Sequence, residues 1–397
     1  MKLKTVRDIE VKGRRVLVRV DFNVSLKNGK VADNARIEQA LPTIKYLLKS
    51  KAKVILLSHL GRPQGKVVED LRLDPVAREL EKLLKKKIKK ANDCVGTEVG
   101  ELASKLKDGE ILLLENTRFH PEEQSNDSAF AKKLASLGDV FVQEAFGAVH
   151  RAHASVSGIG KILPTVAGLL LEKEVNALTK VFDNPQKPLV LVLGGAKIDT
   201  KIGVLRKFCE LADAILLGGG LGNTFLSAEG FEVGESLYEE NKLEIAQEIV
   251  MEALAGSCKI ALPNDVICID GSEEPSERSK TLPFRADAIP FSMKVFDIGE
   301  RTRRQFSEII RKAGTVIWNG PVGLFEVGPF ASGTKAIAEA CAETSATTIL
   351  GGGDTVAALE KFSIPNKKFT HVSTGGGAML EFLEGKQLPG LGAIKKA

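Results

Sequence analysis

The sequence predicts an α/β protein with two similar-sized domains, each with a parallel β-sheet flanked by helices in a Rossmann-like arrangement. Three observations support this fold class. Short apolar runs of strand length alternate with helical patterns along the chain. A length of 397 residues is enough for two domains with substantial cores. Between two sets of strands lies a helical stretch closed by prolines, as is typical of a domain junction.

The proline-closed stretch sets the expected domain boundaries. A helical pattern over 171–182 is followed by Pro185 and Pro188, which cannot continue a helix. We therefore expect a first domain over 1–170, a junction helix over 171–182 and a second domain that begins at 183.

Ten apolar runs, each followed by turn residues, are the expected strand regions. Four lie in the first half, at 14–24, 52–63, 110–120 and 139–155. Six lie in the second half, at 188–202, 212–226, 259–270, 315–326, 347–359 and 370–380.

Composition excludes several classes of protein. The N-terminus has no apolar signal-like region, and no stretch approaches 18 uninterrupted apolar residues, so we expect neither secretion nor a membrane span. Five scattered cysteines without a C-x-x-C pair indicate a reducing, cytoplasmic compartment and no metal framework. We expect a monomer.

The charge is distributed unevenly. Residues 1–170 hold 31 Lys and Arg against 21 Asp and Glu, while residues 171–397 hold 25 against 30. A basic half suits nucleic acid or a small anion. Aromatic residues make up only 5% of the chain, which leaves few platforms for stacking bases. We therefore favour a small anionic substrate and expect no nucleic-acid partner.

The residues that follow the strands differ between the halves. Parallel sheets bind ligands at the carboxyl ends of their strands. The first-half ends carry polar and basic groups: Asp21, Asn23, His59, Arg62, Arg118, His120, His150, Arg151 and His153. The second-half ends carry glycine turns: Gly194-Gly195, Gly218 to Gly220, Gly351 to Gly353 and Gly375 to Gly377. One half thus offers cationic side chains, and the other offers bare backbone for a bound group.

The run Gly375 to Gly377 stands at the head of a predicted helix, with Ser373 and Thr374 as candidate caps. Glycine inside a helix costs roughly 1 kcal/mol against alanine, so it usually serves a close backbone approach. Bare N–H groups at a helix start form an anion site. For a single such run, a tight turn without a ligand is the favoured explanation, so the other glycine turns must decide.

Two further motifs allow a structural and a functional interpretation. Lys197 and Lys201, spaced i, i+4, would share one face of a helix that emerges from a glycine turn, as phosphate ligands or as solvated lysines. Asp354 at a helix start suits either capping or Mg²⁺ coordination. Neither a Walker loop nor a dinucleotide fingerprint is present. A dinucleotide-dependent oxidoreductase and a non-catalytic anion binder remain alternatives, but neither explains the sorting of glycines and arginines into opposite halves.

Assembled, these motifs resemble the phosphoglycerate kinase family over essentially the whole chain. The matching stretches, in order, are VRVDFNV, NARIEQALPTI, SHLGRP, ENTRFH, EAFGAVHRAHAS, LGGAKIDTK, GGGLGNTFL, WNGPVGLFE, GGGDT and STGGGAMLEFLEGKQLPG. The resemblance implies a glycolytic phosphotransferase that reversibly transfers the acyl phosphate of 1,3-bisphosphoglycerate to ADP, giving 3-phosphoglycerate and ATP. It implies Mg²⁺ as cofactor and direct in-line transfer with closure about a hinge helix, 171–182. It also implies a C-terminal tail, 384–397, that packs back on the N-terminal domain, 1–170, which leaves 183–383 as the C-terminal nucleotide-binding domain.

The resemblance also implies roles for individual residues. The phosphoglycerate site would comprise Asp21, Asn23, Arg36, His59, Arg62, Arg118 and Arg151. The groups nearest the transferring phosphoryl group would be Arg36, Lys197, Lys201, Gly375 and Gly376. The nucleotide would contact Gly195, Lys201, Gly219, Asn319, Glu326, Gly352, Gly353, Asp354 and Thr355, with Asp354 as the metal ligand. The sequence departs from the family pattern at Ser25, Glu144 and Gly222, where proline, aspartate and alanine are usual.

Overall fold

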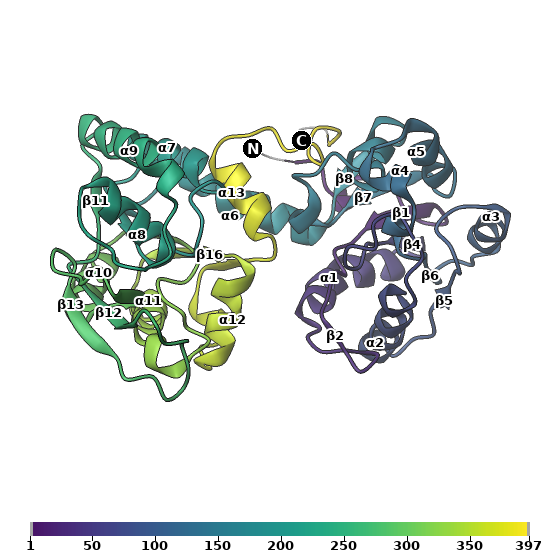
Figure 1. The fold of residues 1–397 in the computed structure, drawn as a ribbon. Helices are drawn as coiled ribbons and strands as arrows, with labels where there is room; N and C mark the ends of the chain where they lie inside the picture. Colours follow the sequence, from purple (N-terminus) through teal and green to yellow (C-terminus); the bar gives the residue numbers. More distant parts are fainter. Residues whose placement is uncertain (1–2, 395–397) are drawn as a thin grey trace. The chain divides into compact units, whose positions relative to one another are not determined.

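The computed structural model describes residues 3–394, apart from the side chain of Val181. The chain divides into two compact units (Figure 1). The first unit comprises Met1–Asn176 with Gln387–Ala397, and the second comprises Ala177–Lys386. Within residues 3–394, none of the helices combines the length and the hydropathy that a membrane crossing needs.

The first unit contains a six-stranded parallel sheet with the strand order β5-β6-β4-β1-β7-β8. Its four inner strands are the four apolar runs expected in the first half, whereas the edge strands β5 and β8 are too short to have a detectable pattern. The strands are β1 (Arg15–Arg19), β4 (Lys53–Leu57), β5 (Lys89–Lys90), β6 (Ile111–Leu113), β7 (Val140–Gln143) and β8 (Thr165–Ala167). A small hairpin, β2 (Leu26–Lys27) and β3 (Lys30–Val31), follows β1.

Helices cover both faces of this sheet, because its buried strands are apolar on both sides. Alternate residues of β1 divide between the faces: Val16 and Val18 pack with Ile37 and Val76 of α1 and α2, while Leu17 packs with residues of α3 and α5. These helices are α1 (Ala35–Lys49), α2 (Asp74–Leu84), α3 (Thr97–Ser104), α4 (Pro121–Gln124) and α5 (Ser128–Ala135). The fold class expected from the sequence is confirmed for this unit.

Short 3₁₀ turns and one π-turn carry several of the loops. In the first unit they are η1 (Val6–Asp8), η2 (Glu69–Leu71), η3 (Thr117–Phe119), η4 (Phe146–Ala148), the π-turn η5 (Ala154–Gly158) and η6 (Ile159–Lys161). In the second unit they are η7 (Glu240–Lys242), η8 (Gly328–Phe330) and η9 (Asn366–Lys368).

The helix expected at 171–182 is α6, which spans Leu169–Asp183, and the division between the units falls inside it. Its first N–H groups lack intrahelical partners, as at any helix start. Here the buried Glu144 carboxyl group accepts hydrogen bonds from the N–H of Leu170 at 3.2 Å and of Leu171 at 3.4 Å. The longer side chain at this departure from the family pattern therefore caps α6.

Glu144 makes stability depend on pH. Burial raises the pKa of this carboxyl group to about 8, above its ordinary 4.5. The folded protein therefore retains a proton that the unfolded chain has lost, so Glu144 lowers the free energy of unfolding as pH rises from about 5 to about 8. We expect Glu144→Gln to reduce the slope of the unfolding free energy against pH, by the equivalent of up to one bound proton. Urea unfolding of both proteins across this range would measure the difference.

Asp297 provides an internal reference for that experiment. Burial raises the pKa of its carboxyl group to about 8 as well, and it accepts a hydrogen bond from the N–H of Gly333 at 2.7 Å. Because Asp297 is present in both proteins, the difference between their pH profiles reports Glu144 alone. Parallel profiles for the two proteins would contradict the prediction.

The second unit contains a six-stranded parallel sheet with the order β11-β10-β9-β15-β16-β17. The strands are β9 (Leu189–Leu193), β10 (Ala214–Leu217), β11 (Lys259–Ala261), β15 (Thr315–Asn319), β16 (Thr347–Gly351) and β17 (His371–Ser373). Its helices are α7 (Ile202–Leu211), α8 (Gly219–Ala228), α9 (Leu243–Ala255), α10 (Glu300–Arg311), α11 (Ser332–Glu343), α12 (Gly353–Lys361) and α13 (Gly376–Leu383). Trp318 lies at the centre of one core face, with Phe306 of α10 and Ile337 of α11.

A separate antiparallel sheet in the second unit was not expected. Its order is β13-β12-β14, formed by β12 (Asp265–Asp270), β13 (Leu282–Arg285) and β14 (Met293–Ile298). The run at 259–270, expected as one strand region, divides at Pro263 into β11 of the parallel sheet and β12 of the antiparallel sheet. The prediction of a single strand region there was wrong. Proline has no N–H to donate to the hydrogen bonds between strands, so Pro263 interrupts the strand.

The C-terminal segment after α13 joins the first unit. The N–H of Gly390 donates to the carbonyl of Val149 at 2.8 Å. A Cβ on Gly390 would lie 2.9 Å from the Cα of Val149, so the two backbones approach closely. This contact fixes the segment next to the loop that follows β7.

Candidate functional site

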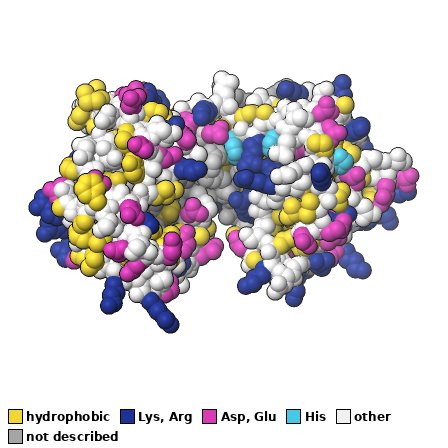
Figure 2. Space-filling model, in the orientation of Figure 1, with side chains coloured by type: hydrophobic (Ala, Val, Ile, Leu, Met, Phe, Trp, Pro, Cys, Tyr) yellow, Lys and Arg dark blue, Asp and Glu magenta, His cyan; other side chains and the backbone are white. Residues whose placement is uncertain are grey.

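The carboxyl ends of the first-unit strands carry a cluster of basic groups. Asp21 follows β1, His59 follows β4, Arg118 lies in η3 after β6, and Arg151 follows η4 after β7. Figure 2 shows Lys and Arg side chains with His beside them gathered on one face of this unit. Neighbouring parallel strands end at one edge of the sheet, which explains why residues distant in sequence meet here.

Asp21 and Asn23 are each held by a neighbour. An Oδ of Asp21 accepts a hydrogen bond from Arg36 Nη1 at 2.8 Å, and Arg36 extends from the first turn of α1. Asn23 Oδ1 accepts from the N–H of Gly61 at 2.8 Å, which leaves its amide NH₂ as a donor. The carboxylate therefore orients the guanidinium of Arg36, whose side chain is 36% exposed.

His59 is buried and held by a second arginine, Arg19. Arg19 Nη2 lies 3.0 Å from His59 Nδ1, and Arg19 Nε donates to Ser155 Oγ at 2.8 Å. Ser155 in turn donates to the buried carboxylate of Glu123 at 2.5 Å. Burial and the nearby guanidinium groups, Arg19 first, hold the pKa of His59 well below its usual range. His59 is therefore neutral, and since Arg19 donates to Nδ1, Nε2 carries the proton.

Arg118 has donors that no protein group uses. Its Nη1 donates to the carbonyl of Gly61 at 2.8 Å, but its buried Nε has no partner. Burial, with Arg151 and Arg19 nearby, lowers the pKa of Arg118 to about 10, and burial with Arg151 lowers that of His150 to about 4. Positive charges crowded together in this way are stabilised by a bound anion.

Two other predicted residues complete this group. Arg62 is exposed, and Arg151 is half-buried with its Nε donating to His150 Nε2 at 3.2 Å. Burial, followed by Arg118 and Arg19, lowers the pKa of His153 to about 4. Since His59, His150 and His153 are neutral at pH 7, the cationic charge comes from the arginines.

Glycine turns occupy the corresponding edge of the second-unit sheet. The backbone of Gly376, at the start of α13, packs against Gly352, which precedes α12 at a φ of +113°. A Cβ on Gly376 would lie 2.6 Å from the Cα of Gly352. A Cβ on Gly194 would lie 2.0 Å from the carbonyl oxygen of Pro321. Side chains are thus excluded here, which leaves the backbone accessible at the starts of α8, α12 and α13.

The N-cap residue of α13 is Gly375, so the expectation that Ser373 or Thr374 occupies this position is wrong. Ser373 lies two residues earlier, and its Oγ accepts a hydrogen bond from the N–H of Gly375 at 3.3 Å. Glycine at the N-cap position offers no side-chain acceptor to the first amides of the helix, and such amides bind anions.

Lys197 and Lys201 do not share a helix face, so that expectation is wrong. α7 begins at Ile202, Lys201 is its N-cap residue, and Lys197 lies exposed in the preceding turn. The glycine turn and Asp199 delay the helix, since such residues favour turns. Lys201 is buried, its Nζ donates to the carbonyl of Lys197 at 3.2 Å, and burial lowers its pKa despite the Asp354 charge.

Four predicted residues surround the β15 and β16 ends. The buried Asn319 amide donates to the carbonyl of Gly351 at 2.6 Å, and Thr355 Oγ1 accepts from the N–H of Gly320 at 2.8 Å. Both polar groups thus already connect the two turns. Asp354 and Glu326 are exposed. Asp354, a hard oxygen ligand in the first turn of α12, fits a Mg²⁺ that retains water and phosphate ligands.

A hollow of about 510 Å³ adjoins the glycine turns within the second unit. Its size and largely apolar lining suit a small-molecule ligand. The lining includes the predicted Gly195 and Gly219 and several residues that the sequence reading missed: Asn223, Leu237, Tyr238, Val295, Phe296 and Leu324. The apolar members had no distinguishing pattern, because they belong to loops and to the unexpected antiparallel sheet.

Ser25 and Gly222, two of the departures from the family pattern, lie at positions with few close side-chain neighbours. Ser25 is exposed at the start of the β2–β3 hairpin, where its carbonyl accepts from the N–H of Ala32. Gly222 lies within α8, and a Cβ there would meet its nearest neighbour, the Leu217 backbone, at 3.4 Å. Neither position is in contact with the charged groups described above.

The chain is similar to known proteins over nearly its whole length. The family model described as phosphoglycerate kinase matches residues 6–386. Proteins named phosphoglycerate kinase from Pelotomaculum thermopropionicum and Moorella thermoacetica are 51% identical over 394 residues and 52% identical over 390, covering 99% and 98% of each chain. The solved phosphoglycerate kinase structures from Coxiella burnetii and Pyrococcus horikoshii have TM-scores of 0.88 and 0.86, at 42% and 33% identity over 98% of each chain.

Proposed function

The chain belongs to the phosphoglycerate kinase family and is a phosphoryl-transferring kinase of glycolysis, and from that premise we propose the following reaction. The acyl phosphate of 1,3-bisphosphoglycerate passes directly to ADP, reversibly and with Mg²⁺, giving 3-phosphoglycerate and ATP. The observation that carries the proposal is the sorting of groups between the units: a cluster of arginines with one unpaired buried donor, Arg118 Nε, in the first, and bare helix amides with a buried lysine in the second.

The first unit would bind the phosphoglycerate. Arg62, Arg118 and Arg151 supply guanidinium donors for the phosphate that is not transferred, and such donors bind phosphate through paired hydrogen bonds. His59 Nε2–H adds a neutral donor, whose orientation the Arg19 contact at 3.0 Å maintains. Asn23 and Asp21 would bind the substrate's hydroxyl and carboxyl region.

The second unit would bind the nucleotide. The hollow beside Gly195 and Gly219 would receive the adenine and ribose. Asn319 and Glu326 would make further contacts with the nucleotide. The amides of Gly352, Gly353, Gly375 and Gly376 and the hydroxyl of Thr355 would bind phosphate oxygens. Asp354 would hold the Mg²⁺, which neutralises phosphate charge when bound.

Transfer requires charge neutralisation and alignment more than proton transfer. One acceptor is a carboxylate and the other a phosphate oxygen, and both are ionised at pH 7, so no general base is needed. Arg36, with Lys201 and Lys197, would neutralise the equatorial oxygens of the transferring phosphoryl group. We propose that motion about α6 closes the two units on their substrates and excludes water before in-line transfer.

The proposal includes a monomeric enzyme of a reducing compartment such as the cytoplasm. Each residue given a role comes from a single chain. The five cysteines are buried and unpaired, which is typical of proteins in a reducing environment.

A coupled assay with purified protein, 3-phosphoglycerate and ATP would test the function. We expect turnover that depends on Mg²⁺ and falls by about 10²- to 10³-fold in Lys201→Ala, as for loss of one transition-state donor. Lys207→Ala, in α7 and also a lysine, serves as the matched control and should retain activity. Folded protein without turnover, or Lys201→Ala with wild-type turnover, would contradict the proposal.

A further inference from the structure

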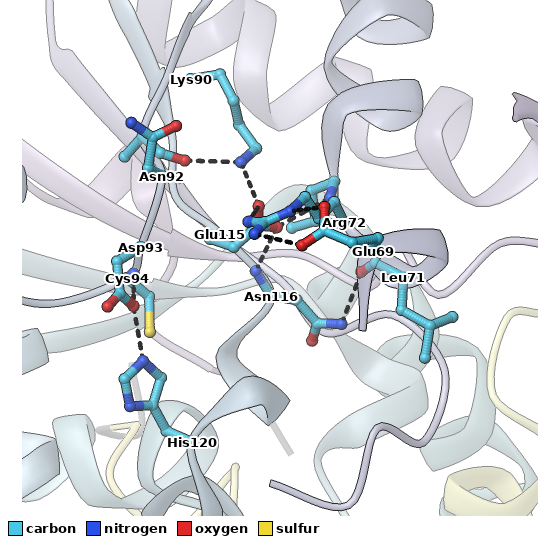
Figure 3. A network of polar contacts seen from close by, with 12 residues as sticks. Glu69, Leu71, Arg72, Lys90, Asn92, Asp93, Cys94, Glu115, Asn116 and His120 are labelled. Carbon is cyan, nitrogen blue, oxygen red and sulfur yellow. Dashed lines mark hydrogen bonds and ion pairs between the residues drawn. The ribbon is translucent and has the colours of Figure 1, made fainter. Parts of the chain in front are cut away.

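Three side chains with different metal-binding atoms meet in the first unit, and none of the three was given a role above. Asp93 and Cys94 lie in the turn after β5, and His120 precedes α4 (Figure 3). One ligand atom from each, a carboxylate oxygen, Sγ and a ring nitrogen, lie within 4.8 Å of one another. Among the described residues this is the single group of His, Cys, Asp and Glu with that property.

Neighbouring contacts fix all three side chains. His120 Nε2 lies 2.6 Å from Asp93 Oδ1, and the same oxygen accepts from the N–H of Cys94 at 2.6 Å. The His120 ring packs against Phe130, with 5.1 Å between ring centroids. The Asp93 carbonyl accepts from the N–H of Glu115 at 3.3 Å, which connects the turn to the end of β6. Ligands held in this way lose little freedom on binding a cation.

We propose that Asp93, Cys94 and His120 form a binding site for a borderline-soft divalent transition-metal ion, of which Zn²⁺ is the best match. Thiolate, imidazole and carboxylate are the three ligand types that Zn²⁺ uses, whereas Mg²⁺ and Ca²⁺ select oxygen. Three protein ligands leave the fourth tetrahedral position for water. On binding, the metal replaces the Cys94 thiol proton, which passes to solvent. His120 coordinates as the neutral imidazole, with one proton on its other ring nitrogen, and Asp93 as the carboxylate.

The burial of the three residues suits such a site. Cys94 is fully buried, while 50% of the Asp93 side chain and 26% of the His120 side chain are exposed. A cation can therefore enter from the solvent side through the carboxylate and the imidazole and reach the sulfur last. This site is independent of the proposed Mg²⁺ ligand, Asp354, which lies in the other unit.

Cobalt(II) titration of the untagged, reduced full-length protein would test the site. A thiolate bound to Co²⁺ gives a near-ultraviolet charge-transfer band, and we expect this band at one equivalent and its loss on adding Zn²⁺. Cys94→Ser should abolish the band. Cys341→Ser, at another fully buried cysteine in the second unit, should keep it. No band in the wild type, or an unchanged band in Cys94→Ser, overturns the proposal.

His120→Gln keeps the test decisive if Cys94→Ser fails to fold, because His120 is partly exposed. We expect it to weaken Co²⁺ binding by about 10- to 100-fold, the loss of metal affinity that is typical when a residue supporting a metal site is replaced. Circular dichroism would verify that the variant is folded. If folded His120→Gln binds Co²⁺ with the affinity of the wild type, the proposal is overturned. It is also overturned if Zn²⁺ does not raise the unfolding temperature of the wild type.

Discussion

Replacing Arg36 with alanine is expected to lower kcat by about 10²- to 10³-fold, with a far smaller change in KM for 3-phosphoglycerate. The side chain is partly exposed at the start of α1, and Asp21 orients it through the 2.8 Å hydrogen bond. In the proposed mechanism its charge acts on the phosphoryl group during transfer, when negative charge spreads over the equatorial oxygens. Steady-state kinetics with varied phosphoglycerate and saturating Mg²⁺-ATP would separate kcat from KM.

Lys45→Ala provides the matched control for Arg36→Ala. Lys45 is an exposed cation on the same helix, α1, so its loss changes the net charge equally without touching the cluster of basic groups. We expect near wild-type kcat for this variant. Arg36→Lys should recover only part of the lost rate, because lysine keeps the charge but not the planar pair of donors. Near wild-type turnover in Arg36→Ala would remove Arg36 from the proposed mechanism.

Much of the fold could be predicted because the information is local. β1, β4, β9 and β15 are apolar runs whose strands are buried on both faces, and such runs need no partner to be recognised. The antiparallel sheet lacked this signal. β13 is largely exposed and contains a proline, and β14 is only half-buried, so neither has a continuous apolar run. Two-residue strands such as β5 are too short to show a pattern of their own and form because a neighbouring strand pairs with them.

The sequence predicts those site residues that directly follow a strand. It does not predict those whose positions depend on tertiary contacts. Asp21, His59 and Arg118 follow apolar runs, so the topology of a parallel sheet alone brings them together. Arg19 lies inside the strand β1, and its contact with His59 depends on packing between distant segments. An arginine within an otherwise apolar run, VLVRV, was the available signal, because a fully buried guanidinium requires partners. The Asp93, Cys94 and His120 group gave no sequence signal, since His120 lies 26 residues after Cys94.

Gly376→Ala is the second substitution for which we expect a large effect. The new Cβ would lie 2.6 Å from the Cα and 2.9 Å from the N of Gly352, and both are backbone atoms that cannot rotate away. The starts of α12 and α13 must then separate, which we expect to cost about 1–3 kcal/mol of stability, as for overpacking. A displacement near 1 Å of the proposed phosphate-binding amides should lower turnover by about 10²-fold. Nucleotide-dependent kinetics and urea unfolding would measure both.

Gly222→Ala separates this steric effect from the general effect of replacing a helix glycine. Its Cβ would meet the Leu217 backbone at 3.4 Å, an ordinary van der Waals distance, in the interior of α8. We therefore expect Gly222→Ala to stabilise the protein by up to about 1 kcal/mol, because alanine is the better helix former. If Gly376→Ala were equally stable and active, the close approach of Gly352 and Gly376 would have no role, and the amides at the start of α13 could not be the phosphate ligands. A loss confined to Gly376→Ala would instead mean that the glycine run is required by backbone proximity, since helix propensity acts in the opposite direction.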